Sequence, residues 1–193
     1  MTFDKLADRC LLFVDERKQM LIELLKEAEL ELTRRCNIYE KEKQHTLSGA
    51  TSLISLTANY KQIIHIHHKG DKLVPMSEDE VYYNSDGTRD SGDPIGYFIR
   101  NSNLLFNRIP SDGKLVYSYY ATVDNEQDVG DDPSPIISEQ YHRDLCDYAI
   151  AISFAKSSPQ LHDKYMNDWE RKVQLIINQD ADRELIHTIK REV

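Results

Sequence analysis

The sequence predicts an α+β protein that is mainly α: a four-helix bundle body with an inserted small antiparallel β lobe and an extended C-terminal tail. Two observations lead to this prediction. Apolar residues recur at helical spacing at both ends of the chain, over residues 4–43 and 138–179. Over residues 52–123 the spacing changes toward two, and turn residues separate the segments. We therefore expect a single domain over residues 1–179, followed by a tail over residues 180–193.

Two helices are expected before the β lobe. The first covers residues 4–16, where Leu6, Cys10 and Val14 recur at helical spacing. The second covers residues 17–43, with Glu and Lys on the faces away from its apolar stripe, where opposite charges add local ion pairs. The stripe consists of Leu21, Leu24, Leu25, Ala28, Leu32, Cys36 and Tyr39.

The β lobe is expected to consist of short strands joined by turns. Its strands are SLISLT, QIIHIHH, IGYFIR, LLFNRI and LVYSYYATV. Gly70 marks one turn, and Pro110 and Gly113 mark another. SEDEVYYN is expected to form a short helix with Ser77 at its N-cap. A linker with two prolines and several acidic residues, residues 124–135, ends this part of the chain.

Two more helices are expected after the linker, over residues 138–157 and 159–179. Pro159 suits the first turn of the second helix, because proline lacks the N–H that is unpaired there. Only SSP separates the two helices, so they should form an antiparallel hairpin. Trp169 carries the largest apolar side chain of the hairpin, and we expect it to be buried.

Composition and net charge limit the classes of partner that the protein is expected to bind. A chain of 193 residues can bury a core without disulfides, and Cys10, Cys36 and Cys146 lie far apart with no CxxC pair, as expected in a reducing compartment. The net charge of −9 argues against general nucleic-acid binding, which favours basic proteins. Neither a secretory signal nor a run of about 18 apolar residues is found, so no membrane partner is expected.

The stretch HIHHKG raises the question of a metal site. On a strand, His65 and His67 share one face and His68 lies on the other, whereas a zinc site needs at least three protein ligands. No spacing recommends a third ligand, so we predict a strand that binds no metal. The alternative is a metal-dependent hydrolase that uses His65 and His67 with an acidic residue. The candidates for further ligands are Asp86, Asp90, His142 and His187.

Two other patterns are interpreted as structural. YYNSDGTRDSGD resembles a calcium loop with Gly87 sixth, but Tyr82 then stands first, where it cannot bind the ion, and Asp93 stands last in place of Glu. We expect a flexible polar loop. Tyr117 and Tyr119 are expected to pack within the protein, because no basic groove accompanies them to bind bases. Glycine-rich phosphate loops and the common hydrolase motifs are missing from the sequence, so we expect no catalytic residues and no cofactor.

The order of the hairpin, the linker and the following helix resembles that of a known protein family. A hairpin, NSNLLFNRIPSDGKLVYSYYATV, contains the pair Tyr119–Tyr120 and precedes the linker, and then comes PIISEQYHRDLCDYAIAISFA. The repeated pattern in this helix is Tyr141, His142, Leu145, Tyr148 and Ala149. From Leu53 to about Gln179, the chain resembles the head–tail adaptor, or connector, proteins of tailed bacteriophages, especially those of podovirus type.

The resemblance implies a structural subunit that is not an enzyme and that resides in the virion after synthesis in the host cytoplasm. Such subunits form a homo-dodecamer beneath the portal protein and join it to a downstream tail protein of nozzle or stopper type. Double-stranded DNA passes through the channel when the genome is ejected. The tail would dock to the portal, with Leu185, Ile186 and Ile189 as anchors. The alternatives are the metal-dependent hydrolase and a small helical protein-interaction module.

Overall fold

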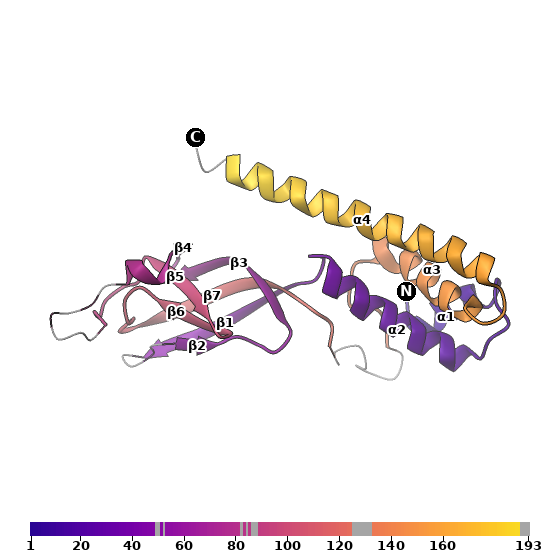
Figure 1. Ribbon diagram of the computed structural model, residues 1–193. Coiled ribbons are helices and arrows are strands. Elements are labelled where there is room, and N and C mark those ends of the chain that lie inside the picture. Colours follow the sequence, from indigo (N-terminus) through magenta and orange to yellow (C-terminus); the bar gives the residue numbers. More distant parts are fainter. Residues whose placement is uncertain are drawn as a thin grey trace. The chain divides into compact units, whose positions relative to one another are not determined.

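The computed structural model describes residues 1–48, 51, 53–81, 83, 85, 89–124 and 133–189, with side chains up to residue 181. The chain divides into two compact units. A helical unit comprises Met1–Tyr39 together with Thr122–Val193, and a sheet unit comprises Glu40–Ala121. Figure 1 shows the helices and strands of both units. Each unit is described by itself below.

The helical unit contains four α-helices in its described part. The first begins at an N-cap, Thr2, whose hydroxyl accepts a hydrogen bond from the Lys5 N–H at 3.3 Å. A 3-10 turn, Glu139–Tyr141, leads directly into the third helix. The helices are α1 (Phe3–Cys10), α2 (Lys18–Arg35), α3 (His142–Phe154) and α4 (Pro159–Ile189).

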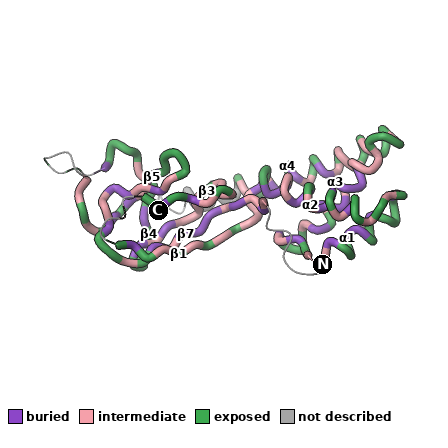
Figure 2. The backbone as a smooth tube through the Cα atoms, turned by 90° about the horizontal axis from the view of Figure 1, so that it is seen from below, coloured by how far each residue is buried: buried purple, intermediate pink, exposed green. Residues whose placement is uncertain are grey.

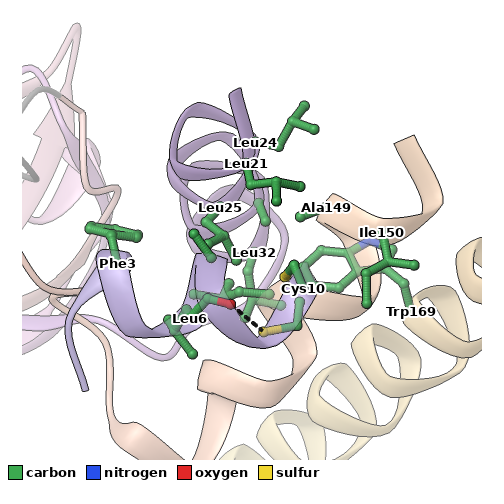
Figure 3. Packing of buried hydrophobic residues seen from close by; sticks show 14 of the residues in the cluster. Phe3, Leu6, Cys10, Leu21, Leu24, Leu25, Leu32, Ala149, Ile150 and Trp169 are labelled. Carbon is green, nitrogen blue, oxygen red and sulfur yellow. Dashed lines mark hydrogen bonds between the residues drawn. The ribbon is translucent and has the colours of Figure 1, made fainter. Parts of the chain in front are cut away.

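The core of the helical unit is built from the apolar stripes of these helices. Most of the stripe predicted for the second helix is buried as expected, from Leu21 to Cys36. Trp169 of α4 is 1% exposed, and its ring meets Tyr148 of α3 edge to face at 5.2 Å between centroids, which confirms its expected burial. Figure 2 shows that buried residues recur along α2 and α3, and Figure 3 shows packed side chains of this core.

The sheet unit is one mixed sheet of seven strands among its described residues, in the order β1-β7-β3-β4-β5-β6-β2. Neighbouring strands are antiparallel except β4 and β5, which are parallel. The strands are β1 (Glu40–Ser48), β2 (Leu53–Ser55), β3 (Tyr60–His68), β4 (Asp71–Pro75), β5 (Gly96–Arg100), β6 (Asn103–Phe106) and β7 (Asp112–Ala121).

Local chemistry matches the turn predicted at Gly70 and the N-cap predicted at Ser77, whereas Gly113, predicted as a turn residue, lies within β7. β3 and β4 are joined by Lys69 and Gly70, whose φ angles are 52° and 96°. Two consecutive positive φ values are typical of a tight hairpin turn, and glycine adopts such a value without a steric penalty. Ser77 precedes a 3-10 helix, Glu78–Glu80, and the Glu80 carboxylate accepts a hydrogen bond from the Ser77 N–H at 2.7 Å, which completes a capping box.

The predicted fold class is wrong. Helices make up 41% of the chain and strands 30%, so the protein is not mainly α with a small antiparallel lobe. The sheet has seven strands, one pair of which is parallel, and it forms a compact unit of its own. The helices form one unit with an independent core rather than the body of the whole protein.

The main reason is the segment that follows α2. The predicted helix over residues 17–43 ends at Arg35, because Cys36 already has extended backbone angles, and residues 40–48 form strand β1. In this strand Lys41 and Lys43 lie opposite Tyr119 and Tyr117 of β7. The alternating Glu and Lys residues are predicted to lie on a helix surface. In the strand they place the half-buried Lys41 and Lys43 on the same face as these tyrosines. The sheet therefore gains the first four residues of its longest edge strand from residues assigned to a helix.

Two helix boundaries also differ from the prediction. α1 ends at Cys10 and is followed by a turn, so it is shorter than the predicted 4–16 helix. α4 continues to Ile189, ten residues past the predicted end at Gln179. In the described part of the chain, no helix combines the length and apolar character needed to cross a membrane.

Candidate functional site

α4 is the element that carries the predicted docking residues, and its first two-thirds are fixed to the helical unit. The Arg35 guanidinium of α2 donates hydrogen bonds to both carboxylate oxygens of Glu170, at 2.7 and 2.6 Å. Lys172 forms ion pairs with Asp147 and, at 2.9 Å, with Asp144, both on α3. These contacts surround the buried Trp169 and hold α4 against α2 and α3.

Asp180, the first residue of the predicted tail, also contacts the rest of the helical unit. The backbone N–H of Asn37 donates a hydrogen bond to Asp180 Oδ2 at 3.1 Å. Past Asp180 the backbone remains helical through Ile189. The side chains of the predicted anchors Leu185, Ile186 and Ile189 lie outside the described residues, so their docking role stays a prediction.

The helical register nevertheless shows on which side of the α4 axis these three positions lie. With about 3.6 residues per turn, positions 185, 186 and 189 fall on the side of the axis opposite to the buried stripe. That stripe comprises Trp169, Val173 and Ile176. Leu175 falls on the same side as the predicted anchors, and it is 56% exposed. The side of α4 that packs in the core of the helical unit is therefore not the side that carries the predicted anchors.

The three histidines lie on β3. As predicted, His65 and His67 lie on one face of the strand and His68 lies on the other. His68 is buried, and its Nε2 lies 2.9 Å from the Asp112 carbonyl oxygen. His65 and His67 occupy the other face, with their rings edge to face at 5.2 Å, and His65 Nε2 lies 3.1 Å from the Ser118 hydroxyl. Each imidazole thus has a polar contact within the sheet unit.

Electrostatics near this histidine pair favour the neutral form of His65. Burial lowers its pKa below the ordinary value, and the nearby His67 and Lys72 lower it further, while Glu42 and Glu40 oppose the shift. A neutral imidazole can bind a metal. Among the described residues, however, no group of three or more His, Cys, Asp or Glu side chains is placed to hold one. Elemental analysis with close to one metal ion per chain would contradict the prediction of a strand without metal.

The residues proposed as further metal ligands are scattered or not described. Asp90 forms an ion pair with Arg108 at 3.3 Å. His142 Nε2 lies 3.0 Å from the Ile137 carbonyl oxygen, in the helical unit. Asp86 and the side chain of His187 lie outside the described residues.

The calcium-like loop falls partly outside the described residues. This is true of Tyr82, of Asn84 and of the positions from Asp86 to Thr88. The last position of the loop, Asp93, is described, and it forms an ion pair with Lys69 at 2.8 Å.

The packing interpretation of the tyrosines is confirmed. Tyr117 and Tyr119 are almost fully buried on one face of β7, with ring centroids 5.6 Å apart. His45 of β1 stacks on Tyr117, with ring centroids 5.8 Å apart and an interplanar angle of 3°. Tyr120 points to the opposite face of the strand. This aromatic group is therefore part of the core of the sheet unit.

Sequence reasoning missed a pair of residues that hold the two ends of the linker. The Glu29 carboxylate, fully buried on α2, accepts hydrogen bonds from the N–H groups of Ile136 and Ile137 at 2.6 and 2.9 Å. One turn along α2, the Thr33 hydroxyl accepts a hydrogen bond from the Val123 N–H at 3.3 Å. The available signal was a glutamate at position 29, four residues after Leu25, within the apolar stripe.

Comparison with known proteins identifies the family of the chain. No curated protein matches the chain. The family model described as SU10 adaptor protein matches residues 1–188, which includes both units and nearly all of α4. The chain therefore belongs to the SU10 adaptor protein family, a family of bacteriophage head–tail adaptors.

Proposed function

We propose that this adaptor is a purely structural subunit of a homo-dodecameric ring in the neck of the virion. The ring joins the portal protein to a downstream tail protein of nozzle or stopper type. Double-stranded DNA passes through its central channel during ejection. Residues 180–193 dock to the portal, with Leu185, Ile186 and Ile189 as the anchors.

Family membership is the observation that carries this proposal. The match extends from the first residue to residue 188, so it covers the sheet unit, most of the helical unit and the first part of the docking segment, which includes Leu185 and Ile186 but not Ile189. A phage head–tail adaptor is a component of the particle and has protein partners on its two sides.

The geometry of α4 supports the docking role. The helix is fixed by Arg35 and Asn37 as far as Asp180, and it continues for about two more turns. An apolar side chain that becomes buried in a partner contributes roughly 1.5–3 kcal/mol. Three anchors per copy are a modest contribution alone, but the copies in a ring act together on one portal.

The charge balance supports the channel role. A protein that neutralises many phosphates binds DNA tightly and in a salt-dependent way. A net charge of −9 per chain disfavours such contacts. A ring of acidic subunits is thus suited to let a duplex slide through its centre without holding it.

A measurement of mass tests the proposal. The purified full chain is measured by light scattering or native mass spectrometry, alone and after mixing with a portal ring. We expect a complex that contains one adaptor copy per portal subunit. A chain that stays monomeric and separate from the portal under all conditions would contradict the proposed function.

A further inference from the structure

Two cysteine thiols meet inside the helical unit. Cys10 is the last residue of α1 and is fully buried, and Cys146 of α3 is 7% exposed. Cys146 Sγ lies 4.0 Å from the carbonyl oxygen of Leu6, one turn before Cys10 on α1. In an α-helix the same Leu6 carbonyl accepts the hydrogen bond of the Cys10 N–H, so the Cys146 thiol lies beside Cys10. Figure 3 shows Cys10 among the packed apolar side chains of this core.

The pair is chemically unequal. The neighbouring Cys146 thiol, together with burial, raises the pKa of the Cys10 thiol. The Cys10 thiol in turn lowers the pKa of Cys146, and the charge of Arg9 acts in the same direction while burial opposes it. Cys146 is therefore the member of the pair that more readily supplies a thiolate, the form that attacks a disulfide.

The third cysteine is separate from this pair. Cys36, at the end of α2, is buried, and its Sγ lies 3.9 Å from the Val173 carbonyl oxygen of α4. All three cysteines are free thiols. Cys36 is thus a control within the same chain for a buried thiol that packs against a different helix.

We propose that Cys10 and Cys146 form a modification site, at which oxidation produces an intramolecular disulfide that ties α1 to α3. The oxidant is a small-molecule disulfide such as oxidised glutathione. This inference concerns the fold of the chain and does not rest on the ring or on portal docking.

The reaction proceeds by two exchange steps. When α1 opens, Cys10 leaves the burial and the neighbouring thiol that raise its pKa. Its thiolate then attacks the oxidant, so a Cys10–glutathione bond forms and the glutathione disulfide breaks, releasing one glutathione thiolate. The Cys146 thiolate then attacks Cys10 Sγ and expels the second glutathione. The two thiol protons pass to the two released thiolates. The net products are one protein disulfide and two reduced glutathione molecules.

Local opening of α1 gives the oxidant access. The helix has eight residues, which is too short to be stable without its packing contacts. Such elements open at lower free energy than the core as a whole. When α1 closes again, a bulky glutathione adduct on Cys10 meets the packed core beside Cys146, which favours its displacement by the neighbouring thiolate.

A phage subunit passes from a reducing compartment to an oxidising one, which would convert this site from two thiols to a disulfide. Thiols stay reduced in the cytoplasm, where the subunit is made, and disulfides persist in the oxidising medium outside the cell. A bridge between residues so far apart in sequence closes a long loop and restricts the unfolded chain. The expected effect is a more stable helical unit in the released particle.

The test uses the full chain incubated with oxidised glutathione and then denatured, alkylated and weighed by mass spectrometry. We expect the alkylatable thiols to fall from three to one, peptide mapping to show a Cys10–Cys146 bridge, and the Tm to rise relative to the reduced protein. Cys36→Ser should retain the bridge, and Cys10→Ser and Cys146→Ser should abolish it.

Three results would overturn the inference. The first is full alkylation of all thiols in the oxidised Cys36→Ser protein, which retains the pair. The second is a glutathione adduct on Cys10 or Cys146 that persists without a protein disulfide. The third is a main product that links Cys36 of two molecules. None of these results bears on ring formation, which the mass measurement with the portal tests separately.

Discussion

Glu29 is the residue on which the path of the chain after the linker depends most. Its buried carboxylate accepts hydrogen bonds from two backbone N–H groups, those of Ile136 and Ile137. The same helix holds Val123, before the linker, through Thr33. Two neighbouring side chains of α2 therefore bring both ends of the linker to one place in the helical unit.

Replacing Glu29 by Ala should destabilise the helical unit. Each buried N–H that loses its acceptor costs about 1–3 kcal/mol, so the free energy of unfolding should fall by at least that amount. Urea denaturation followed by circular dichroism measures it. Glu23→Ala is the matched control, because Glu23 is exposed on the same helix. Equal stability of the two variants would show that Glu29 does not hold the linker.

Trp169 is the residue with the largest buried side chain. Trp169→Ala removes its packing and its edge-to-face contact with Tyr148, and such a change costs about 3–5 kcal/mol. Thermal unfolding of the helical signal should therefore occur at a clearly lower temperature than in the unaltered protein. Trp169→Phe, which retains a ring, should lose less. A Trp169→Ala protein with unchanged Tm would contradict the packing described for α4.

At the scale of elements, the contact between α2 and α4 depends on pH. The hydrogen bonds from Arg35 hold the pKa of the Glu170 carboxyl below its ordinary value. A lowered pKa in the folded state means that the pair stabilises the fold above the ordinary pKa of about 4.5. This stabilisation is lost as the pH falls through the lowered pKa.

Glu170→Gln should reproduce that loss at neutral pH. Because both side chains are partly exposed, solvent screens the pair, and the expected loss of stability is about 0.2–1 kcal/mol. Denaturation curves at pH 7 and pH 3 measure it: the variant should be less stable at pH 7 and nearly equal at pH 3. Asp163→Asn, an exposed change on the same helix, is the control. A difference that persists unchanged at pH 3 would exclude the Arg35 pair as its cause.

How far the sequence predicted the fold also depends on particular elements. Helical periodicity located α2, α3 and the start of α4, because leucine stripes and Pro159 act locally. The same logic failed at residues 36–43, where strand pairing of Lys41 and Lys43 with the tyrosines of β7 outweighs a helix-like charge pattern. That partner lies more than seventy residues away in sequence, so no local pattern reveals it.

The candidate site shows the same division between local and distant information. The apolar positions of the tail were visible in the sequence, and helical spacing alone assigns them to one side of α4. The roles of Glu29 and Thr33 were not visible, because they depend on where the chain returns after the linker. The meeting of Cys10 with Cys146 likewise requires the packing of α1 on α3.

At the scale of the whole molecule, the proposed attachment depends on the last turns of α4. Deleting residues 181–193 retains Asp180 and its hydrogen bond from the Asn37 N–H, and it leaves Trp169 and the ion pairs of Lys172 in place. The fold should therefore be intact, with the unfolding midpoint close to that of the full chain. Stable attachment to the portal should be lost, because the predicted anchors Leu185, Ile186 and Ile189 are removed together.

Two substitutions in the full chain distinguish the contribution of the anchor side chains from the contribution of helix length. Leu185→Asp with Ile189→Asp keeps the tail and places charge where burial is expected, and it should abolish co-purification with the portal. Leu161→Asp makes the same kind of change at an exposed position near the start of α4, and it should have no effect. If the truncated protein or the Leu185/Ile189 variant co-purifies with the portal as well as the full chain does, the tail is not the anchor. Attachment must then use another surface of the adaptor.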